Sequence, residues 1–140
     1  MQTRVRAVGA SLALAVVTLL LAGCHPTPVV VIDDVVGIED QTAHFQVRLE
    51  AVGPGVPQTH VRIELYCTTS PGTAGVADYS GMSGQRCGTI LPGTVSTYID
   101  IPLLLDDIDE DRETFSLTLR VVGAGVKRGS AIGAITKNWT

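Results

Sequence analysis

Apolar and polar residues alternate with a period of two at several places after residue 28, and this pattern constrains the fold more than any other feature of the sequence. In the segment 44–50, Phe45, Val47 and Leu49 are separated by polar or charged side chains. Such alternation is typical of an antiparallel strand with one buried face. The same alternation, or a short apolar run, recurs in other segments: 29–36, 61–66, 98–103, 115–121 and 130–136. No stretch with helical periodicity accompanies them, so the sequence predicts an all-β protein.

Turn signals rich in glycine and proline separate these segments, as at Gly53-Pro54-Gly55 and Leu91-Pro92-Gly93. About seven short strands, each with one apolar face, fit two packed sheets better than one open sheet. We therefore expect a single antiparallel β-sandwich spanning residues 29–140. Only 4% of the residues are aromatic, so aliphatic and small side chains must fill its core. Pro102 interrupts one alternating segment, which predicts an edge strand or a bulge because proline cannot donate to a ladder.

The amino-terminal segment does not read as part of this sandwich. Two arginines precede an apolar run at residues 10–22, which is too short to span a bilayer comfortably. The run ends in Leu21-Ala22-Gly23-Cys24, which resembles the bacterial lipobox. This resemblance implies a signal peptide over residues 1–23 and acylation of Cys24, followed by a short tether over residues 24–28. An ordinary signal peptide with an incidental cysteine is the alternative.

A lipid on Cys24 would fix where the protein resides. Acyl chains in a bilayer contribute about 0.8 kcal/mol per CH₂, so a multiply acylated cysteine holds a protein stably on a membrane surface. Residue 25 is histidine rather than aspartate, which by resemblance to lipoprotein sorting favours the outer membrane in a cell that has one. The predicted location is therefore the cell envelope, with the membrane as a partner through the N-terminal lipid.

Two further cysteines, Cys67 and Cys87, follow in a chain that is expected to reach an oxidising compartment. We expect them to form a structural disulfide. Closing a loop of about 20 residues stabilises a fold by about 3 kcal/mol in the chain-entropy model. A zinc site would need more thiolates or nearby histidines, and a reactive thiol is disfavoured when a partner is at hand.

The charge of the mature chain is strongly acidic and unevenly spread. All 14 carboxylates and all but two of the ten basic residues follow residue 23, which leaves 8 positive and 14 negative charges, a net charge of −6. This balance disfavours nucleic-acid binding through a basic surface. Six of the carboxylates fall within the eight positions 106–113. This cluster is the main functional signal in the sequence.

Several short motifs occur in a fixed order along the mature chain. They are Glu39 ahead of Phe45-Gln46-Val47-Arg48-Leu49, then Gly72-Thr73-Ala74, Asp78-Tyr79, and finally Asp106-Asp107-Ile108-Asp109-Glu110-Asp111-Arg112-Glu113-Thr114-Phe115. The ordered set resembles the Calx-beta domain over nearly all of the mature chain. The resemblance implies an immunoglobulin-like sandwich that binds Ca²⁺ at one end through carboxylates of the loops between strands.

The resemblance also implies which residues hold the ion. Calcium takes six to eight oxygen ligands, so several carboxylates must converge on it. Carried over by position, the ligands are Glu39, Asp78, Asp106, Glu110 and Glu113, with Asp107 and Asp109 as neighbours. In calcium-binding members the last strand ends in acidic residues, whereas here Lys137 and Trp139 stand in that region. A site with fewer carboxylates is expected to bind Ca²⁺ weakly.

The predicted function is that of a lipid-anchored, calcium-binding module for interaction or adhesion, with an envelope or surface protein as its partner. The first alternative is a structural or partner-binding sandwich whose calcium site is vestigial, the acidic cluster then being a solvated loop. An enzyme is a more distant alternative. No motif for a nucleophile, a phosphate loop or an imidazole metal site is present in the sequence.

Overall fold

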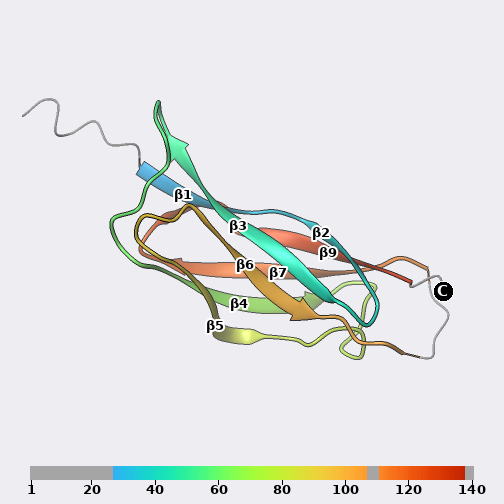
Figure 1. Cartoon of the computed structure of the whole chain (residues 1–140). Helices are drawn as coiled ribbons and strands as arrows, with labels where there is room; N and C mark the ends of the chain where they lie inside the picture. The colour runs from blue at the N-terminus through green and yellow to red at the C-terminus, as the bar shows by residue number, and fades with distance from the viewer. Residues whose placement is uncertain (1–26, 107–110, 138–140) are drawn as a thin grey trace, which may run out of the picture.

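Nine strands in two sheets packed face to face make up the part of the chain that the computed structural model describes, residues 27–106 and 111–137 (Figure 1). In chain order the strands are β1 (Thr27–Ile32), β2 (Val35–Ile38), β3 (Thr42–Val52), β4 (Ile63–Pro71), β5 (Ser83–Ile90), β6 (Ser96–Pro102), β7 (Glu113–Val122), β8 (Gly125–Arg128) and β9 (Ser130–Thr136). One sheet has the order β6-β3-β1-β8 and the other β2-β9-β7-β4-β5. The prediction of an all-β, immunoglobulin-like sandwich is confirmed.

The strand count and the pairing differ from the prediction in two respects. There are nine described strands rather than about seven, because the segment 29–36 forms two strands and the sequence pattern predicts neither β5 nor β8. Their sequences, SGQRCGTI and GVKR, lack an alternating apolar face, so only pairing with a neighbour defines them. The sheets are also mixed rather than purely antiparallel, since β1 pairs with β8 and β2 pairs with β9 in parallel.

The opening apolar run at 29–36 is divided between the two sheets. The break falls at Asp33 and Asp34. Asp33 is bound within the four-stranded sheet, and Asp34 is bound by one strand of each sheet. Arg48 of β3 donates to both carboxylate oxygens of Asp33, at 2.9 and 3.2 Å. The Asp34 carboxylate accepts from the backbone N–H of Ile132 at 2.7 Å and from Arg128 at 2.6 Å. Two acidic side chains therefore fix the point where the chain crosses from one sheet to the other.

Aliphatic side chains from both inner faces fill the core, as the composition predicts. Residues with at most 1% of their surface exposed include Val30, Ile32, Val47, Ile63, Leu65, Ile90, Ile99, Ile101 and Leu117. Cys67 of β4 and Cys87 of β5 form the predicted disulfide, with a Cα–Cα distance of 5.7 Å. β6 is an edge strand, so the edge position predicted from Pro102 is confirmed. No helix within the described residues is long and apolar enough to cross a membrane.

Three aromatic rings meet at one end of this core. Phe45 of β3 packs edge-to-face on Phe115 of β7, with ring centroids 5.9 Å apart, and thereby joins the two sheets. Tyr79, in the connection between β4 and β5, stacks on Phe115 at 4.3 Å. Gly133 of β9 leaves the room that these rings need, because a Cβ there would lie 2.6 Å from the Phe115 ring and 2.9 Å from that of Phe45.

Replacing Gly133 by alanine tests this packing. The added methyl group must displace two buried rings, and overpacking of this kind costs about 1 to 3 kcal/mol of folding free energy. Gly125→Ala is the matched control, since its Cβ would meet only the Val29 side chain at an ordinary 3.5 Å. Urea denaturation should place Gly133→Ala well below the parent and Gly125→Ala close to it. Equal stability of the two variants would contradict the packing described.

Candidate functional site

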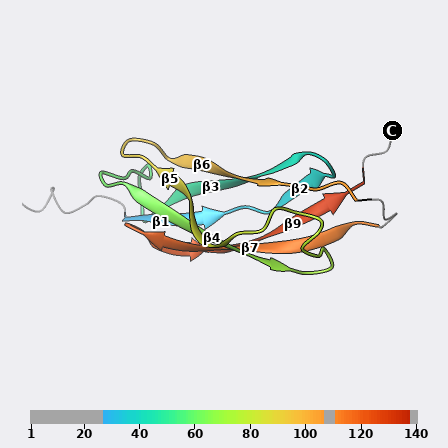
Figure 2. The same ribbon diagram turned by 90° about the horizontal axis from the view of Figure 1, so that it is seen from below.

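The topology brings strand ends from both sheets to one end of the sandwich, which we call the acidic end. Strand register defines it: Ile38 lies opposite Thr136, Ile135 opposite Glu113, Thr42 opposite Pro102 and Pro71 opposite Phe115. Both views show the loops beyond these residues together, at the end opposite to the start of β1 (Figures 1 and 2). By sequence, nine of the 14 carboxylates fall in the segments 39–41, 72–82 and 103–113 that connect these strands.

Backbone hydrogen bonds tie these segments to one another. The N–H of Glu39 donates to the carbonyl of Thr136 at 3.0 Å, which joins the β2–β3 turn to the end of β9. The N–H of Leu103 donates to Gln41 at 2.8 Å, and that of Leu104 donates to Asp78 at 2.8 Å. The connection after β6 therefore lies between the β2–β3 turn and the β4–β5 connection. Each of these bonds involves a candidate ligand or a residue within three positions of one.

The Gly72-Thr73-Ala74 motif fixes the β4–β5 connection against the start of β7. The N–H of Ala74 donates to the carbonyl of Thr114 at 2.9 Å, and the N–H of Thr114 donates to the Thr73 hydroxyl at 2.8 Å. A Cβ on Gly72 would lie 2.5 Å from the Thr114 carbonyl oxygen, so only glycine permits this approach. The motif thus places the start of the connection beside Glu113.

Asp78 and Tyr79 then shape the middle of the same connection. One carboxylate oxygen of Asp78 accepts from the N–H of Gly75 at 2.5 Å, and the N–H of Asp78 donates back to the Gly75 carbonyl at 3.2 Å. Tyr79 is 3% exposed and forms an isolated bridge with Leu103 beside its stack on Phe115. Asp78 therefore already has a structural role as the residue that closes a turn.

Burial has an electrostatic consequence at Tyr79. Removal of the phenol from water raises the pKa of Tyr79 above its ordinary value, a hydrogen bond with Thr69 opposes this shift, and the negative charge of Asp78 adds to it. The Tyr79 side chain therefore stays neutral over the whole physiological range of pH, and its buried ring supports the loops of the acidic end.

The structure places four of the seven predicted ligands at the acidic end. They are Glu39, Asp78, Asp106 and Glu113, each half-buried, whereas Asp107, Asp109 and Glu110 lie outside the described residues. Within residues 27–106 and 111–137, no group of three or more acidic, histidine or cysteine side chains is close enough to hold a metal ion. The four described carboxylates thus share one end of the molecule without forming a metal centre among themselves, and the ligand set stays a prediction.

One residue that the sequence analysis did not single out also belongs to this end. Asp40 occupies the β2–β3 turn with a left-handed backbone, φ 64°, and the turn is closed by a hydrogen bond from Gln41 to Ile38 at 3.1 Å. Aspartate tolerates this conformation better than most residues. The sequence signal for Asp40 is its position directly after Glu39, in the short polar segment between two predicted strands.

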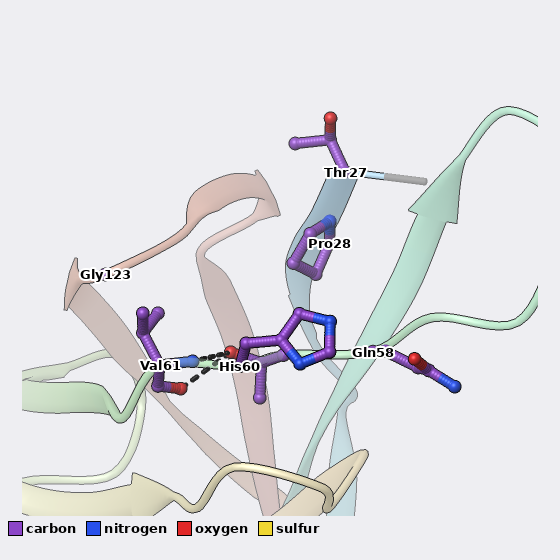
Figure 3. Close-up of a pocket in the computed structure, with 7 residues that line it drawn as sticks. Thr27, Pro28, Gln58, His60, Val61 and Gly123 are labelled. Atoms are coloured by element: carbon purple, nitrogen blue, oxygen red, sulfur yellow. Dashed lines mark hydrogen bonds between the residues drawn. The ribbon is translucent and has the colours of Figure 1, made fainter. Parts of the chain in front are cut away.

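The opposite end, where β1 starts at Thr27, is called the proximal end because it is nearest in sequence to Cys24. It carries a hollow of about 350 Å³ between the start of β1, the β3–β4 connection and the β7–β8 turn (Figure 3). Its lining consists of Thr27, Pro28, Gln58, Thr59, His60, Val61 and Gly123. The Thr59 hydroxyl donates to the Val61 carbonyl at 2.6 Å and accepts from its N–H, as the dashed lines show. His60 is the one titratable side chain among the described lining residues, and a single imidazole does not form an acid–base pair.

Solved structures of Calx domains, one of them described as a calcium binding domain, are similar to this fold. The apo form of the Calx CBD1 domain matches with a TM-score of 0.61 and 17% identity, over 81% of this chain and 99% of that one. The fold is Calx-beta-like. The calcium binding domain CBD12 of CALX1.1 matches with a TM-score of 0.60 and 17% identity, over 77% of this chain and 45% of that one. The Calx CBD2 domain matches at 0.55 and 13% identity, over 79% of this chain and 88% of that one. No family model and no curated protein matches the sequence.

The raised pKa of Tyr79 predicts how stability depends on alkaline pH. Because the folded protein holds the phenol proton more tightly than the unfolded chain, this group leaves stability unchanged below pH about 10 and lowers it as the pH rises further. Tyr79→Phe should remove this part of the decline. Tyr98→Phe, at a residue 58% exposed, should retain it. Urea denaturation of both variants between pH 8 and about 11 measures the difference, and an unchanged alkaline slope in Tyr79→Phe would refute the role assigned to burial.

Proposed function

We propose that the protein is a lipid-anchored sandwich that binds Ca²⁺ at the acidic end and serves the cell envelope as an interaction or adhesion module. One observation carries the proposal. The strand register brings the segments that bear Glu39, Asp78, Asp106 and Glu113 to the same end of the fold. The Calx-beta-like fold adds support, since the similar structures include one described as a calcium binding domain.

Electrostatics favour a cation at this end. Carboxylates gathered at one end of a fold repel one another, and a divalent ion lowers this repulsion while using their oxygens as ligands. The loops themselves rest on fixed supports, namely the Tyr79–Phe115 stack and the hydrogen bonds from Ala74 and Leu104. Only the acidic side chains would then need to adjust around an ion. We therefore propose Glu39, Asp106, Asp107, Asp109, Glu110 and Glu113 as ligands, with Asp78 as a further ligand.

Two features predict weak binding. One carboxylate oxygen of Asp78 already accepts a hydrogen bond from the N–H of Gly75, and this hydrogen bond competes with an ion for the carboxylate. Lys137 directly follows the end of β9, where it brings a positive charge to the acidic end. A weak site is occupied at millimolar concentrations of Ca²⁺, as in extracellular modules.

A second candidate function is a scaffold with a vestigial site. It is favoured by the finding that the described carboxylates do not form a group of three at metal-binding distance. The proposals differ in whether calcium changes the stability of the folded protein.

Calcium titration of the protein separates them. At a concentration of Ca²⁺ tenfold above Kd, binding to the native state adds about 1.4 kcal/mol and raises the melting temperature by about 5 °C. Glu113→Gln should weaken binding at least tenfold, because it removes a charge and an oxygen ligand. Lys137→Glu should strengthen it. Asp100→Asn is the matched control, since the Asp100 carboxylate pairs with His44 at 2.6 Å on the face of a sheet. This variant should bind Ca²⁺ with the same affinity as the parent in calorimetry.

Absence of heat and of a thermal shift at millimolar Ca²⁺ would leave the scaffold as the function. An equal response to Mg²⁺ would point to general charge screening rather than a calcium site.

The anchor is proposed separately from the calcium site and has its own test. Mass spectrometry of the protein from bacterial membranes should find an amino-terminal peptide that starts at Cys24 and carries acyl chains. Cys24→Ser should release the protein from the membrane fraction. A mature chain that starts at another residue, or an unmodified Cys24, would refute the anchor and leave the calcium proposal standing.

A further inference from the structure

Three loops and the strand ends beside them close the proximal end around the start of β1, and they present apolar side chains to solvent. The residues are Val52, Val56, Val61, Leu91, Val95 and Val122, with exposures between 45% and 71%. Register places them together, since Val52 lies opposite Thr27 and Val122 opposite Glu64 at the start of β4. Single exposed apolar residues are common on protein surfaces, whereas a group of six at one end of a sandwich is typical of an interaction surface.

The loops are fastened to one another and so form one surface. The N–H of Gly93 donates to the carbonyl of Thr59 at 3.1 Å, which links the β5–β6 loop to the β3–β4 connection. The N–H of Leu49 donates to Val95 at 2.8 Å. The β7–β8 turn packs so closely that a Cβ on Gly123 would lie 2.8 Å from the Arg62 carbonyl oxygen. The apolar side chains therefore share a rigid support.

This surface differs from the acidic end in charge. The connecting segments 53–62, 91–95 and 123–124 contain no aspartate or glutamate, but they do contain His60 and Arg62. The carboxylates nearest to them in the strands are compensated. Glu50 pairs with Arg48 and with Lys127, both at 2.5 Å, and Glu64 pairs with Arg86 at 3.5 Å. Exposed apolar side chains also occur at the acidic end, namely Val36, Ile38, Val76, Leu104 and Leu105. There, however, the connecting segments around them carry nine carboxylates by sequence.

The length of chain before β1 limits how far this surface can lie from an anchor. Cys24 precedes Thr27 by three residues, which span at most about 10 Å when fully extended. An acylated Cys24 would therefore hold the start of β1 within that distance of the bilayer surface. Apolar side chains beside a lipid anchor gain free energy by entering the headgroup region, and nearby basic residues favour anionic lipids.

We propose that the proximal end is seated on the lipid bilayer, with its exposed valines and Leu91 at headgroup level and the acidic end directed away from the membrane. This orientation rests on the proposed anchor and is independent of calcium binding. β3, with 11 residues, rises about 35 Å along the sandwich, which is several Debye lengths at physiological salt. The acidic end would thus lie outside the field of an anionic membrane.

Depth-dependent fluorescence quenching tests the orientation in the full-length acylated protein. Val56→Cys and Val76→Cys are the matched pair, because both side chains are exposed, at 71% and 82%, but lie at opposite ends of the sandwich. Each is labelled with a polarity-sensitive dye and reconstituted into vesicles of phosphatidylethanolamine and phosphatidylglycerol that contain brominated lipid. The dye at position 56 should be quenched, with a blue-shifted emission, and the dye at position 76 should not.

A charged variant adds a second readout. Val61→Asp in the Val56→Cys protein should reduce quenching, since one valine leaving the bilayer weakens the contact by about tenfold. The Ca²⁺ response of this variant should be unchanged.

Quenching at neither position, with acylation of Cys24 confirmed by mass, would overturn the bilayer contact and leave a protein partner as the occupant of this surface. Quenching at both positions would overturn the upright orientation. An unacylated Cys24 would overturn the proposal at its premise, whereas loss of calcium binding alone would not affect it.

Discussion

The edge-to-face contact between Phe45 and Phe115 is the interaction on which the acidic end depends. These are the two phenylalanines of the chain, and each comes from a different sheet. An aromatic pair of this geometry contributes about 0.5 to 1.5 kcal/mol beyond the burial of its area. Phe115 also carries Tyr79 on its face, and Gly133 gives the rings their space. One cluster thus fixes the spacing of the sheets and the height of the loop that bears Asp78.

Much of the fold could be predicted from the sequence because burial on one face leaves a period of two in the residues. This period is present in β3, β6 and β7, whose inner faces are apolar. It is absent from β5 and β8, which are edge strands with polar sequences and exist through pairing with a neighbour. The opening run at 29–36 predicts one strand but forms two, because its valines are suitable for either sheet. The contacts of Asp33 and Asp34 mark where the chain crosses.

The candidate site was predictable as a set of residue types but not as a geometry. The motifs placed their members at one end, and the structure supplies physical reasons for several of them: close approach at Gly72, a hydroxyl acceptor at Thr73 and ring stacking at Tyr79. The sequence could not reveal that Asp78 closes a turn, since that depends on the path of the backbone around Gly75. Nor could it decide how carboxylates from separate loops converge, because loop conformations follow from contacts that no periodic pattern encodes.

The placement of the first and last strands has a mechanical consequence. β1 begins at the proximal end, β9 finishes at the acidic end, and both run along the length of the sandwich (Figure 2). Tension applied between Thr27 and Thr136 would act along the strands, and it would shear the ladders that β1 makes with β3 and β9 makes with β7. Ladders loaded in shear share the force among all their hydrogen bonds, whereas a peeled hairpin loses them one at a time. The topology therefore suits a module that is pulled at its two ends.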